Sequence, residues 1–290
     1  MKKLFTGFCI TALSLSLLAG CGQKKNEATD SAEKGSLIGS TKSAAATADD
    51  QFEAIKKRGD IIIGLDDAFV PLGFRNEKNE IVGFDVDMAK EAAGRLGLKA
   101  TFQPIDWTMK ENELNQKAID LIWNGYSVTD ERREKVLFTD AYLKNKQSVV
   151  VPANSKVNSI KDLTGVKVGT QDQSSGLDAI NAAGIASDFA GGEPSLYGNF
   201  NEAFIDLENG RIEALVVDEI LAKYYTAQKG AEKFRILDEN LGTEDYAVGI
   251  RKTDVTLQKA LNDALNEMKK DGSAARISET WFGSDIIAKP

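Results

Sequence analysis

Apolar residues in the first half of the chain follow two patterns, short runs typical of buried strands and spacings typical of amphipathic helices. They predict strands at 60–65, 100–103 and 119–123, helices at about 85–96 and 112–117, and a hairpin around 77–79. Asp85 stands where the first of these helices begins, so we expect its side chain to be the N-cap. The order strand, helix, strand, helix, strand predicts a parallel sheet.

The same alternation starts again after Tyr142. It predicts strands at 147–151, 166–169, 214–217 and 246–250, helices at 177–183, 201–209, 219–229 and 256–270, and an extended segment at 234–237. The helix at 256–270 is the most clearly amphipathic, with Leu257, Leu261 and Met268 on one face. The chain therefore contains two α/β modules, the second between Gln147 and about Asp238.

The first 50 residues follow neither pattern. Residues 1–20 carry Lys2 and Lys3 before an apolar run that is too short for a membrane span, as in an export signal. Leu18-Ala-Gly-Cys21 is typical of a lipoprotein signal in which the cysteine is acylated; the alternative is a plain secretory signal with a chance cysteine. Residues 21–50 are small and polar and predict a flexible tether with a reach of about 30 Å.

Composition excludes several classes of protein. The 290 residues carry a formal net charge of −8, which argues against a nucleic acid partner because phosphate backbones need a basic surface. There is no histidine, and the cysteines are Cys9 and Cys21. Imidazole bases, cysteine nucleophiles, Cys/His zinc sites and disulfides of the folded part are thus excluded. We expect neither a metal nor a cofactor.

The stretch from Ile119 to Tyr142 holds the most informative chemistry. A buried strand ends at Trp123, and Asn124-Gly125 then breaks it. Ligands of open α/β sheets bind at the carboxyl ends of strands, and Arg132 offers a guanidinium suited to a carboxylate there. The alternative for a single arginine after a strand is an ordinary connection with a solvated charge cluster.

The pattern is longer than a single arginine. G-Y-S-V-T-D-E-R at 125–132, followed by F-T-D-A-Y at 138–142, resembles the signature of amino-acid-binding proteins of ABC importers, the glutamine, histidine and lysine/arginine/ornithine binders. The resemblance extends from about Asp60 to Gly283. It implies a two-lobed periplasmic-binding-protein-like fold, each lobe a mostly parallel sheet with flanking helices, and a ligand cleft between them. It also implies two hinge crossings, with 51–143 plus 243–290 in lobe 1 and 144–242 in lobe 2.

The resemblance also implies the two charged contacts. Arg132, rather than its neighbour Arg133, matches the arginine that binds the ligand's carboxylate. Asp218 matches the aspartate that holds the α-ammonium; its alternative role is the N-cap of the helix at 219–229. Phe69 and Trp107 match rings that enclose the ligand's aliphatic stem, the alternative being core residues.

The remaining candidates complete the cleft. Asp66 matches a position near the far end of the ligand, while Asn124, Gly125 and Ser127 lie beside the motif. In the second lobe the candidates are Gln171, Ser174 and Ser175. Asp172-Gln173 stands where the family often has glycine, so this correspondence is open by one residue.

These residues predict an extracytoplasmic, lipid-anchored and monomeric protein that binds a free amino acid by domain closure and docks on an ABC permease. The alternatives are a cleft enzyme of the cyclohexadienyl dehydratase type and a ligand-sensing domain for a membrane receptor. Which amino acid binds is left open. A neutral or cationic polar side chain is preferred, because an acidic one beside Asp66 would have no counter-ion unless Lys110, Lys144 or Lys146 reached the cleft.

Overall fold

The computed structural model describes residues 49–289. The predictions for the signal peptide, for Cys21 and for most of the tether fall outside this range. The described chain begins its first helix, α1, at Phe52 and ends it at Arg58. No helix within 49–289 has the length and apolar character that a membrane span requires.

The first of two five-stranded sheets has the order β5-β1-β6-β13-β7. Its strands are β1 (Asp60–Leu65), β5 (Lys99–Pro104), β6 (Leu121–Ile122), β7 (Leu137–Phe138) and β13 (Gly249–Ile250). β1 pairs in parallel with β5 and β6, whereas β13 runs antiparallel to both β6 and β7. Four strands therefore point in one direction and β13 alone is reversed.

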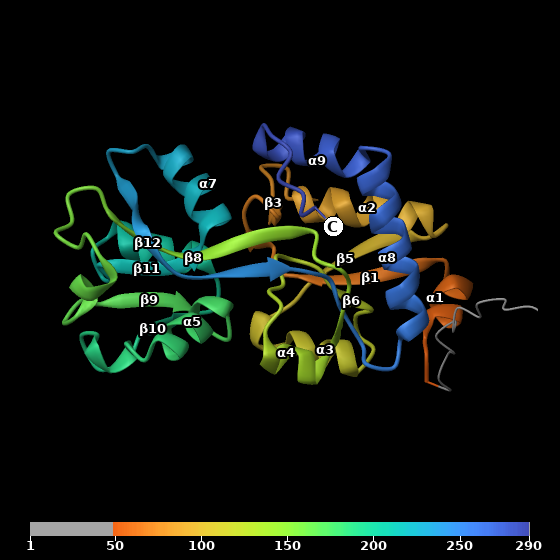
Figure 1. Ribbon diagram of the computed structural model, residues 1–290, viewed down its shortest axis with the longest axis horizontal. Helices are drawn as coiled ribbons and strands as arrows, with labels where there is room; N and C mark the ends of the chain where they lie inside the picture. The colour runs from red at the N-terminus through yellow and green to blue at the C-terminus, as the bar shows by residue number, and fades with distance from the viewer. Residues whose placement is uncertain (1–48, 290) are drawn as a thin grey trace, which may run out of the picture. The chain divides into compact units, whose positions relative to one another are not determined.

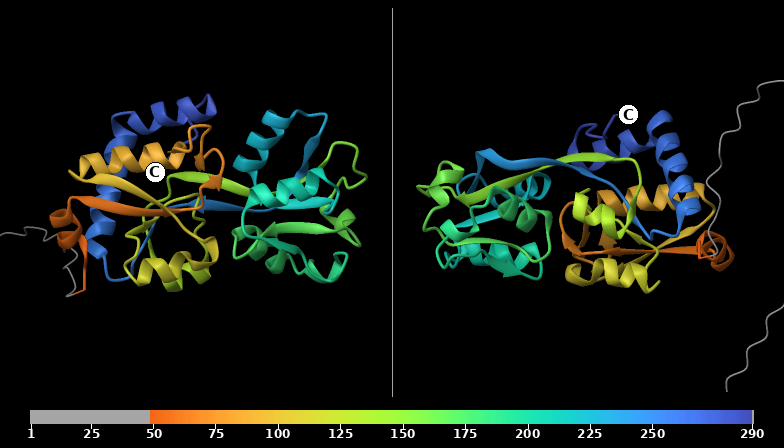
Figure 2. Two further views of the ribbon diagram at one scale, coloured as in Figure 1. Left: turned by 180° about the vertical axis from the view of Figure 1, so that it is seen from behind. Right: turned by 60° about the horizontal axis from the view of Figure 1, so that its bottom comes forward.

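Helices cover both faces of this sheet (Figure 1). α2 (Phe84–Arg95), α8 (Val255–Lys270) and α9 (Ser273–Phe282) lie on one face, and α3 (Lys110–Asn115) and α4 (Asp130–Lys135) lie on the other (Figure 2). α8 buries the stripe that its sequence predicts, including Leu257, Leu261 and Met268. A small three-stranded sheet of β2 (Ala68–Phe69), β3 (Gly73–Arg75) and β4 (Ile81–Val82) lies beside them. We call this assembly lobe 1.

The second sheet repeats the topology in the order β10-β9-β11-β8-β12. Its strands are β8 (Leu143–Pro152), β9 (Val168–Gln171), β10 (Ser195–Tyr197), β11 (Ala214–Asp218) and β12 (Phe234–Tyr246). β9 pairs in parallel with β10 and β11, and β8 alone is reversed. Its helices are α5 (Ser175–Ala183), α6 (Phe200–Glu208) and α7 (Glu219–Lys229), and we call this assembly lobe 2. The predicted fold class is confirmed.

Two strands connect the lobes. β8 and β12 pair antiparallel from Leu143 opposite Tyr246 to Pro152 opposite Phe234, and both run from one lobe into the other (Figure 1). The pairing is interrupted by register shifts between Ile236 and Asn240 and between Asn240 and Thr243. Bulges of this kind bend a strand locally without ending its pairing.

Three details differ from the sequence prediction. Gly83, not Asp85, is the N-cap of α2, and the Asp85 carboxylate lies buried inside the protein. β10 was not predicted, because its three residues are largely exposed and carry no apolar run. Tyr246 ends the long β12 and does not begin the last strand, which is only Gly249–Ile250.

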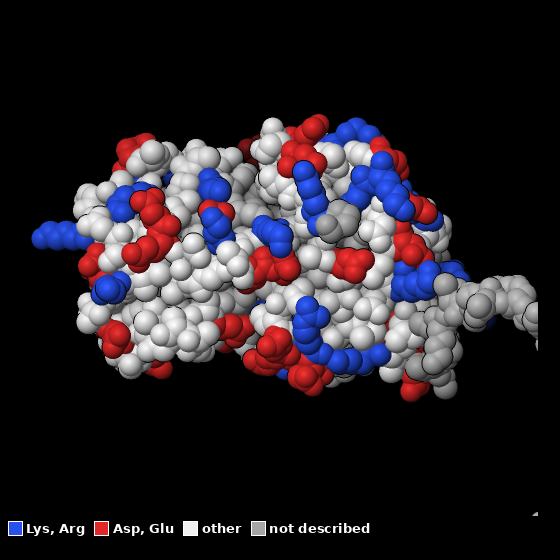
Figure 3. Space-filling view, viewed as in Figure 1, with Lys and Arg blue, Asp and Glu red and all other residues white. Residues whose placement is uncertain are grey.

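On the face shown in Figure 3, basic and acidic side chains are interspersed over both lobes. Such a mixed surface differs from the basic stripe that nucleic acid binding requires.

Candidate binding site

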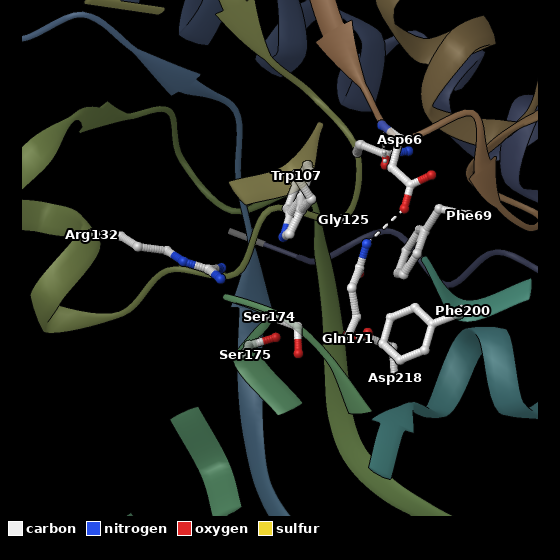
Figure 4. A pocket seen from close by; sticks show the side chains of 11 residues that line it. Asp66, Phe69, Trp107, Gly125, Arg132, Gln171, Ser174, Ser175, Phe200 and Asp218 are labelled. Atoms are coloured by element: carbon white, nitrogen blue, oxygen red, sulfur yellow. Dashed lines mark hydrogen bonds between the residues drawn. The ribbon is translucent and has the colours of Figure 1, made fainter. Parts of the chain in front are cut away.

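A cavity lies between the carboxyl ends of the parallel strands of the two lobes. Lobe 1 and lobe 2 contribute, in chain order, Asp66, Phe69, Trp107, Asn124, Gly125, Arg132, Gln171, Ser174, Ser175, Phe200 and Asp218 (Figure 4).

Arg132 enters the cavity because α4 is tied down at its start. The Thr129 side chain caps the helix by accepting the Arg132 backbone N–H at 3.1 Å. The guanidinium is buried, donates to the Ser127 carbonyl at 3.1 Å and lies over the Tyr126 ring at 4.7 Å. Arg133 is exposed and does not line the cavity. Burial of Arg132 among carbonyls and a ring does not fit a solvated charge cluster.

Gly125 holds the turn that follows β6. Its φ of +56° favours glycine, and a Cβ there would lie 2.9 Å from both Leu72 and Phe69 atoms. Its N–H donates to the Asp85 Oδ2 at 2.7 Å, which also accepts the Tyr142 hydroxyl at 2.9 Å. Asp85 thus supports the cavity wall from behind, and burial raises the pKa of its carboxyl to about 7.

Asp66 follows β1 directly and occupies another part of the lobe 1 wall. Its backbone N–H donates to the Asn124 Oδ1 at 3.1 Å, and its Oδ1 accepts the Ala68 N–H at 2.9 Å. Burial raises the pKa of the Asp66 carboxyl to about 6. The other oxygen, Oδ2, accepts the Gln171 amide at 2.8 Å from the opposite lobe (Figure 4).

Asp218 is delivered by β11, a continuous buried run typical of a parallel strand covered on both faces. Although Asp218 precedes α7, its side chain makes no capping hydrogen bond. Its Oδ1 instead accepts the amides of Asn145 at 2.7 Å and Gln147 at 2.9 Å, and the Tyr246 hydroxyl. Burial and the nearby Glu244 carboxylate raise the pKa of Asp218. Asp218 therefore occupies the N-cap position of α7, but its side chain does not cap the helix.

Two serines begin α5 on the lobe 2 wall. Ser174 is the N-cap and accepts the Leu177 N–H at 3.2 Å. Ser175 accepts a hydrogen bond from Ser127 of lobe 1 at 3.0 Å between the two hydroxyl oxygens. Ser127 does not line the cavity, and it contributes its carbonyl to Arg132 and its hydroxyl to this bridge.

Aromatic rings form the apolar part of the wall. Phe69 and Phe200 face each other from the two lobes at 5.9 Å between ring centroids, and Trp107 packs edge-on against Tyr126 at 5.9 Å. Phe200 was not among the predicted residues. The sequence signal for Phe200 was its place directly after Asn199, the N-cap of α6. Because β10 was not predicted, the strand that leads to this helix was not recognised.

The prediction also omitted Asn145 and Gln147, which hold Asp218 in place. The sequence signal for both residues is the alternation along β8, in which Lys144 and Lys146 are exposed and Asn145 and Gln147 are buried. Polar amides at buried positions of a strand need partners inside the protein. Both amides donate a hydrogen bond to the Asp218 carboxylate.

Lys110 is buried at the edge of the cleft but does not line the cavity. Its ammonium donates to the Trp107 carbonyl at 3.1 Å and, across the cleft, to the Gln173 carbonyl at 3.2 Å. Arg132 donates to the same Gln173 carbonyl at 3.3 Å. Burial lowers the pKa of Lys110 to about 8. Two lobe 1 cations therefore contact one carbonyl of lobe 2.

The model of the bacterial extracellular solute-binding proteins, family 3, matches residues 61–284. A crystal structure of an ABC uptake transporter substrate-binding protein from Streptococcus pneumoniae with bound histidine is 42% identical, with a TM-score of 0.81 over 84% of this chain and 100% of that one.

Two curated relatives are similar over most of their length. The L-cystine-binding protein TcyJ of Escherichia coli is 31% identical over 80% of this chain and 86% of its own. The ABC transporter glutamine-binding protein GlnH of Bacillus subtilis is 28% identical over 98% of this chain and 99% of its own. These relatives are binding proteins. The family resemblance that the sequence predicted is confirmed, and the chain belongs to family 3 of the bacterial extracellular solute-binding proteins.

Proposed function

We propose that the protein is the substrate-binding component of an ABC importer for a polar amino acid, with a neutral or cationic side chain preferred. One observation carries the proposal: a single cavity has a buried arginine, Arg132, on its lobe 1 wall and a buried carboxylate, Asp218, on its lobe 2 wall. A free amino acid is a small zwitterion, and these two groups match its two charges.

The carboxylate of the amino acid binds Arg132. A guanidinium and a carboxylate form directional, charge-assisted hydrogen bonds that strengthen where water is excluded. Ser174 and Ser175 lie on the facing wall and offer hydroxyl and backbone donors at the start of α5. The ammonium binds Asp218, whose Oδ1 is held by protein donors.

The side chain of the amino acid extends toward Asp66 between the rings of Phe69, Trp107 and Phe200. Among the lining residues, all within the described range, Arg132 is the only cation. An acidic side chain would lose its hydration beside Asp66 without gaining a partner, at a cost of several kcal/mol. An amide or a cation can instead replace Gln171 as the partner of Asp66, which supports a neutral or cationic ligand.

Ligand capture takes place by closure of the lobes, with 51–143 plus 243–290 as one body and 144–242 as the other. β8 and β12 act as the two hinge crossings between them. The closed form docks on the permease, and no covalent step is involved. Binding proteins among the relatives support this assignment over a cleft enzyme.

The protein acts outside the cytoplasm as a monomer anchored through Cys21. The Leu18-Ala-Gly-Cys21 motif after a short apolar run supports the anchor, and several acyl chains on one cysteine give stable attachment, since each buried CH₂ contributes about 0.8 kcal/mol. Cys21→Ala expressed in the native host should release the protein from the membrane fraction. Unchanged membrane retention of the variant would count against the anchor.

A thermal-shift panel of the twenty standard amino acids and L-cystine tests the binding function. A ligand that binds only the folded protein raises the melting temperature, by an amount that grows with its concentration relative to Kd. We expect a shift with one or more of glutamine, histidine, arginine, lysine or cystine, and none with aspartate or glutamate. A larger shift with the acidic amino acids would contradict the assignment of Asp66.

A further inference from the structure

Behind the Asp218 wall of the cavity lies a second acid, Glu244, at the end of β12 nearest the cleft. The two carboxyl groups share their donors. The Asn145 amide donates to Asp218 Oδ1 at 2.7 Å and to Glu244 Oε1 at 2.6 Å, and the Gln147 amide donates to the same two oxygens at 2.9 Å each. Two oxygens that accept from the same pair of nitrogens must lie close together.

No lysine or arginine of the described chain forms an ion pair with either acid. Glu244 also faces an outer hollow whose charged residues are Asp130, Arg133, Lys144, Lys146, Glu219 and Asp245. Two of the cations there have other partners, Lys144 with Asp245 at 2.9 Å and Lys146 with Glu219 at 3.9 Å. On the inner side, Tyr246 is the only further titratable group within 49–289 that forms a hydrogen bond with Asp218, and it donates its hydroxyl.

The Gln147 side chain supplies a second, independent observation. It is 2% exposed, and its Oε1 accepts no hydrogen bond from the described residues. Its nitrogen meanwhile donates to Ser175 at 3.0 Å as well as to both acids. A buried carbonyl oxygen without a donor costs free energy. This cluster therefore has acceptors in excess and lacks N–H donors with positive charge.

We propose that Glu244 is a positioning residue of the ammonium subsite: it shares one proton with Asp218 while the cavity is empty, and the ammonium of the bound amino acid displaces that proton to solvent. The inference rests on the proposed function. Burial and the repulsion from the adjacent Glu244 carboxylate both raise the pKa of Asp218 and favour its protonated form while no cation is present. The arriving ammonium brings the missing charge, so both become carboxylates. The proton passes to buffer and no other bond is made or broken.

The pH dependence has a definite sign. Binding favours the ionised pair, so it lowers the pKa at which the shared proton is lost. Affinity is therefore greatest above the pKa of the empty pair and falls as pH drops through it, by up to about tenfold for each pH unit. At high pH the affinity is limited instead by loss of the ligand's own ammonium proton.

Isothermal titration calorimetry of the purified full chain measures the released proton. L-arginine and L-glutamine are titrated at pH 7 in phosphate and in Tris, whose ionisation enthalpies differ, and at several pH values. We expect the wild type to release a substantial fraction of one proton per ligand. Glu244→Gln should release less and show a flatter pH profile, because the repulsion from Glu244 is removed and burial alone then raises the pKa of Asp218.

Asp245→Asn is the matched control. Asp245 is adjacent on β12 and pairs with Lys144, and it does not share donors with Asp218. It should release protons as the wild type does. Glu244→Asp, which keeps the carboxyl, should restore part of the release if Glu244→Gln folds poorly.

Wild-type binding without proton release would overturn the inference, as would equal release from the wild type and a folded Glu244→Gln. Failure of every amino acid in the thermal-shift panel to bind is a different result. It would remove the proposed function itself, and with it the ligand on which this inference depends.

Discussion

The two lobes share a topology but supply different chemistry to the cavity. In lobe 1 the order β5-β1-β6-β13 places β1 between the two parallel strands that follow it in the chain, β5 and β6, with the reversed strand β13 next to β6. Lobe 2 has the same arrangement, β10-β9-β11-β8, with β9 in the place of β1 and β8 in the place of β13. Lobe 1 contributes the lining cation, Arg132, and two of the three lining rings. Lobe 2 contributes hydroxyls, an amide and the buried Asp218.

The difference shows how one fold used twice can bind a molecule that has two unlike ends. Equivalent strand ends meet across the cleft, as where Asp66 after β1 contacts Gln171 at the end of β9. In the proposed function, the contacts to the two charges of a zwitterion therefore come from different lobes, Arg132 from lobe 1 and Asp218 from lobe 2.

The largest expected effect comes from removing the lobe 1 cation. Arg132→Ala should weaken amino acid binding by about 2–5 kcal/mol, since truncation of one partner leaves the buried carboxylate of the ligand unpaired. Arg133→Ala is the matched control and should have little effect, because that side chain is exposed. Calorimetry that gives equal, small losses for both variants would break the assignment of the carboxylate to lobe 1.

Removing the lobe 2 anion comes next. Asp218→Asn keeps the shape of the side chain but removes the charge that meets the ammonium, so we expect a loss of about 1.5–3 kcal/mol in binding. Glu219→Gln, the next residue, should bind as the wild type does, because Glu219 pairs with Lys223 at 3.2 Å on the surface of α7. Stronger weakening by the control than by Asp218→Asn would contradict the division between the lobes.

Asp66 of lobe 1 should make the affinity for a cationic amino acid, relative to a neutral one, dependent on pH. A cationic side chain would keep Asp66 ionised, so arginine should bind more weakly as pH falls through about 6, the pKa of Asp66 in the free protein. The side chain of glutamine carries no charge. The ratio of the arginine and glutamine affinities therefore separates the effect of Asp66 from that of the proton shared by Asp218 and Glu244, which acts on both ligands. Asp66→Asn should abolish the pH dependence of the ratio, whereas Asp67→Asn should preserve it. A ratio that is constant from pH 5 to 8 in the wild type would argue against contact with Asp66.

The smallest effect concerns the contact that closes the lobes beside the cavity. Lys110→Met removes a hydrogen bond to the Gln173 carbonyl and should weaken binding by about 1 kcal/mol, with a more open average form in small-angle scattering. In the wild type the same contact should weaken as pH rises above about 8, where Lys110 loses its proton. Lys135→Met, an exposed neighbour that pairs with Glu131, should change neither measurement.

The sequence predicted those parts of the fold that depend on local pattern. The end of a buried strand pointed to Gly125 and Arg132, the family resemblance added Asp66 and Asp218, and the structure places all four on one cavity. Asp85 was misjudged because N-cap preference considers the next few residues, whereas its partner Gly125 lies 40 residues away. Phe200, Asn145 and Gln147 were missed because short exposed strands and buried polar positions acquire meaning only through tertiary contacts.

The start of α5 has one more consequence. The first turn of an α-helix carries a partial positive charge of about half an elementary charge, and Ser174 and Ser175 place that turn on the wall of the cavity. The helix dipole of lobe 2 therefore favours a carboxylate, the same group that the proposed function assigns to Arg132 of lobe 1. An amine without a carboxylate would leave the positive start of α5 without a negative partner. We therefore expect the carboxylate of the ligand to attract lobe 1 and lobe 2 at the same time, so that binding also favours closure of the lobes.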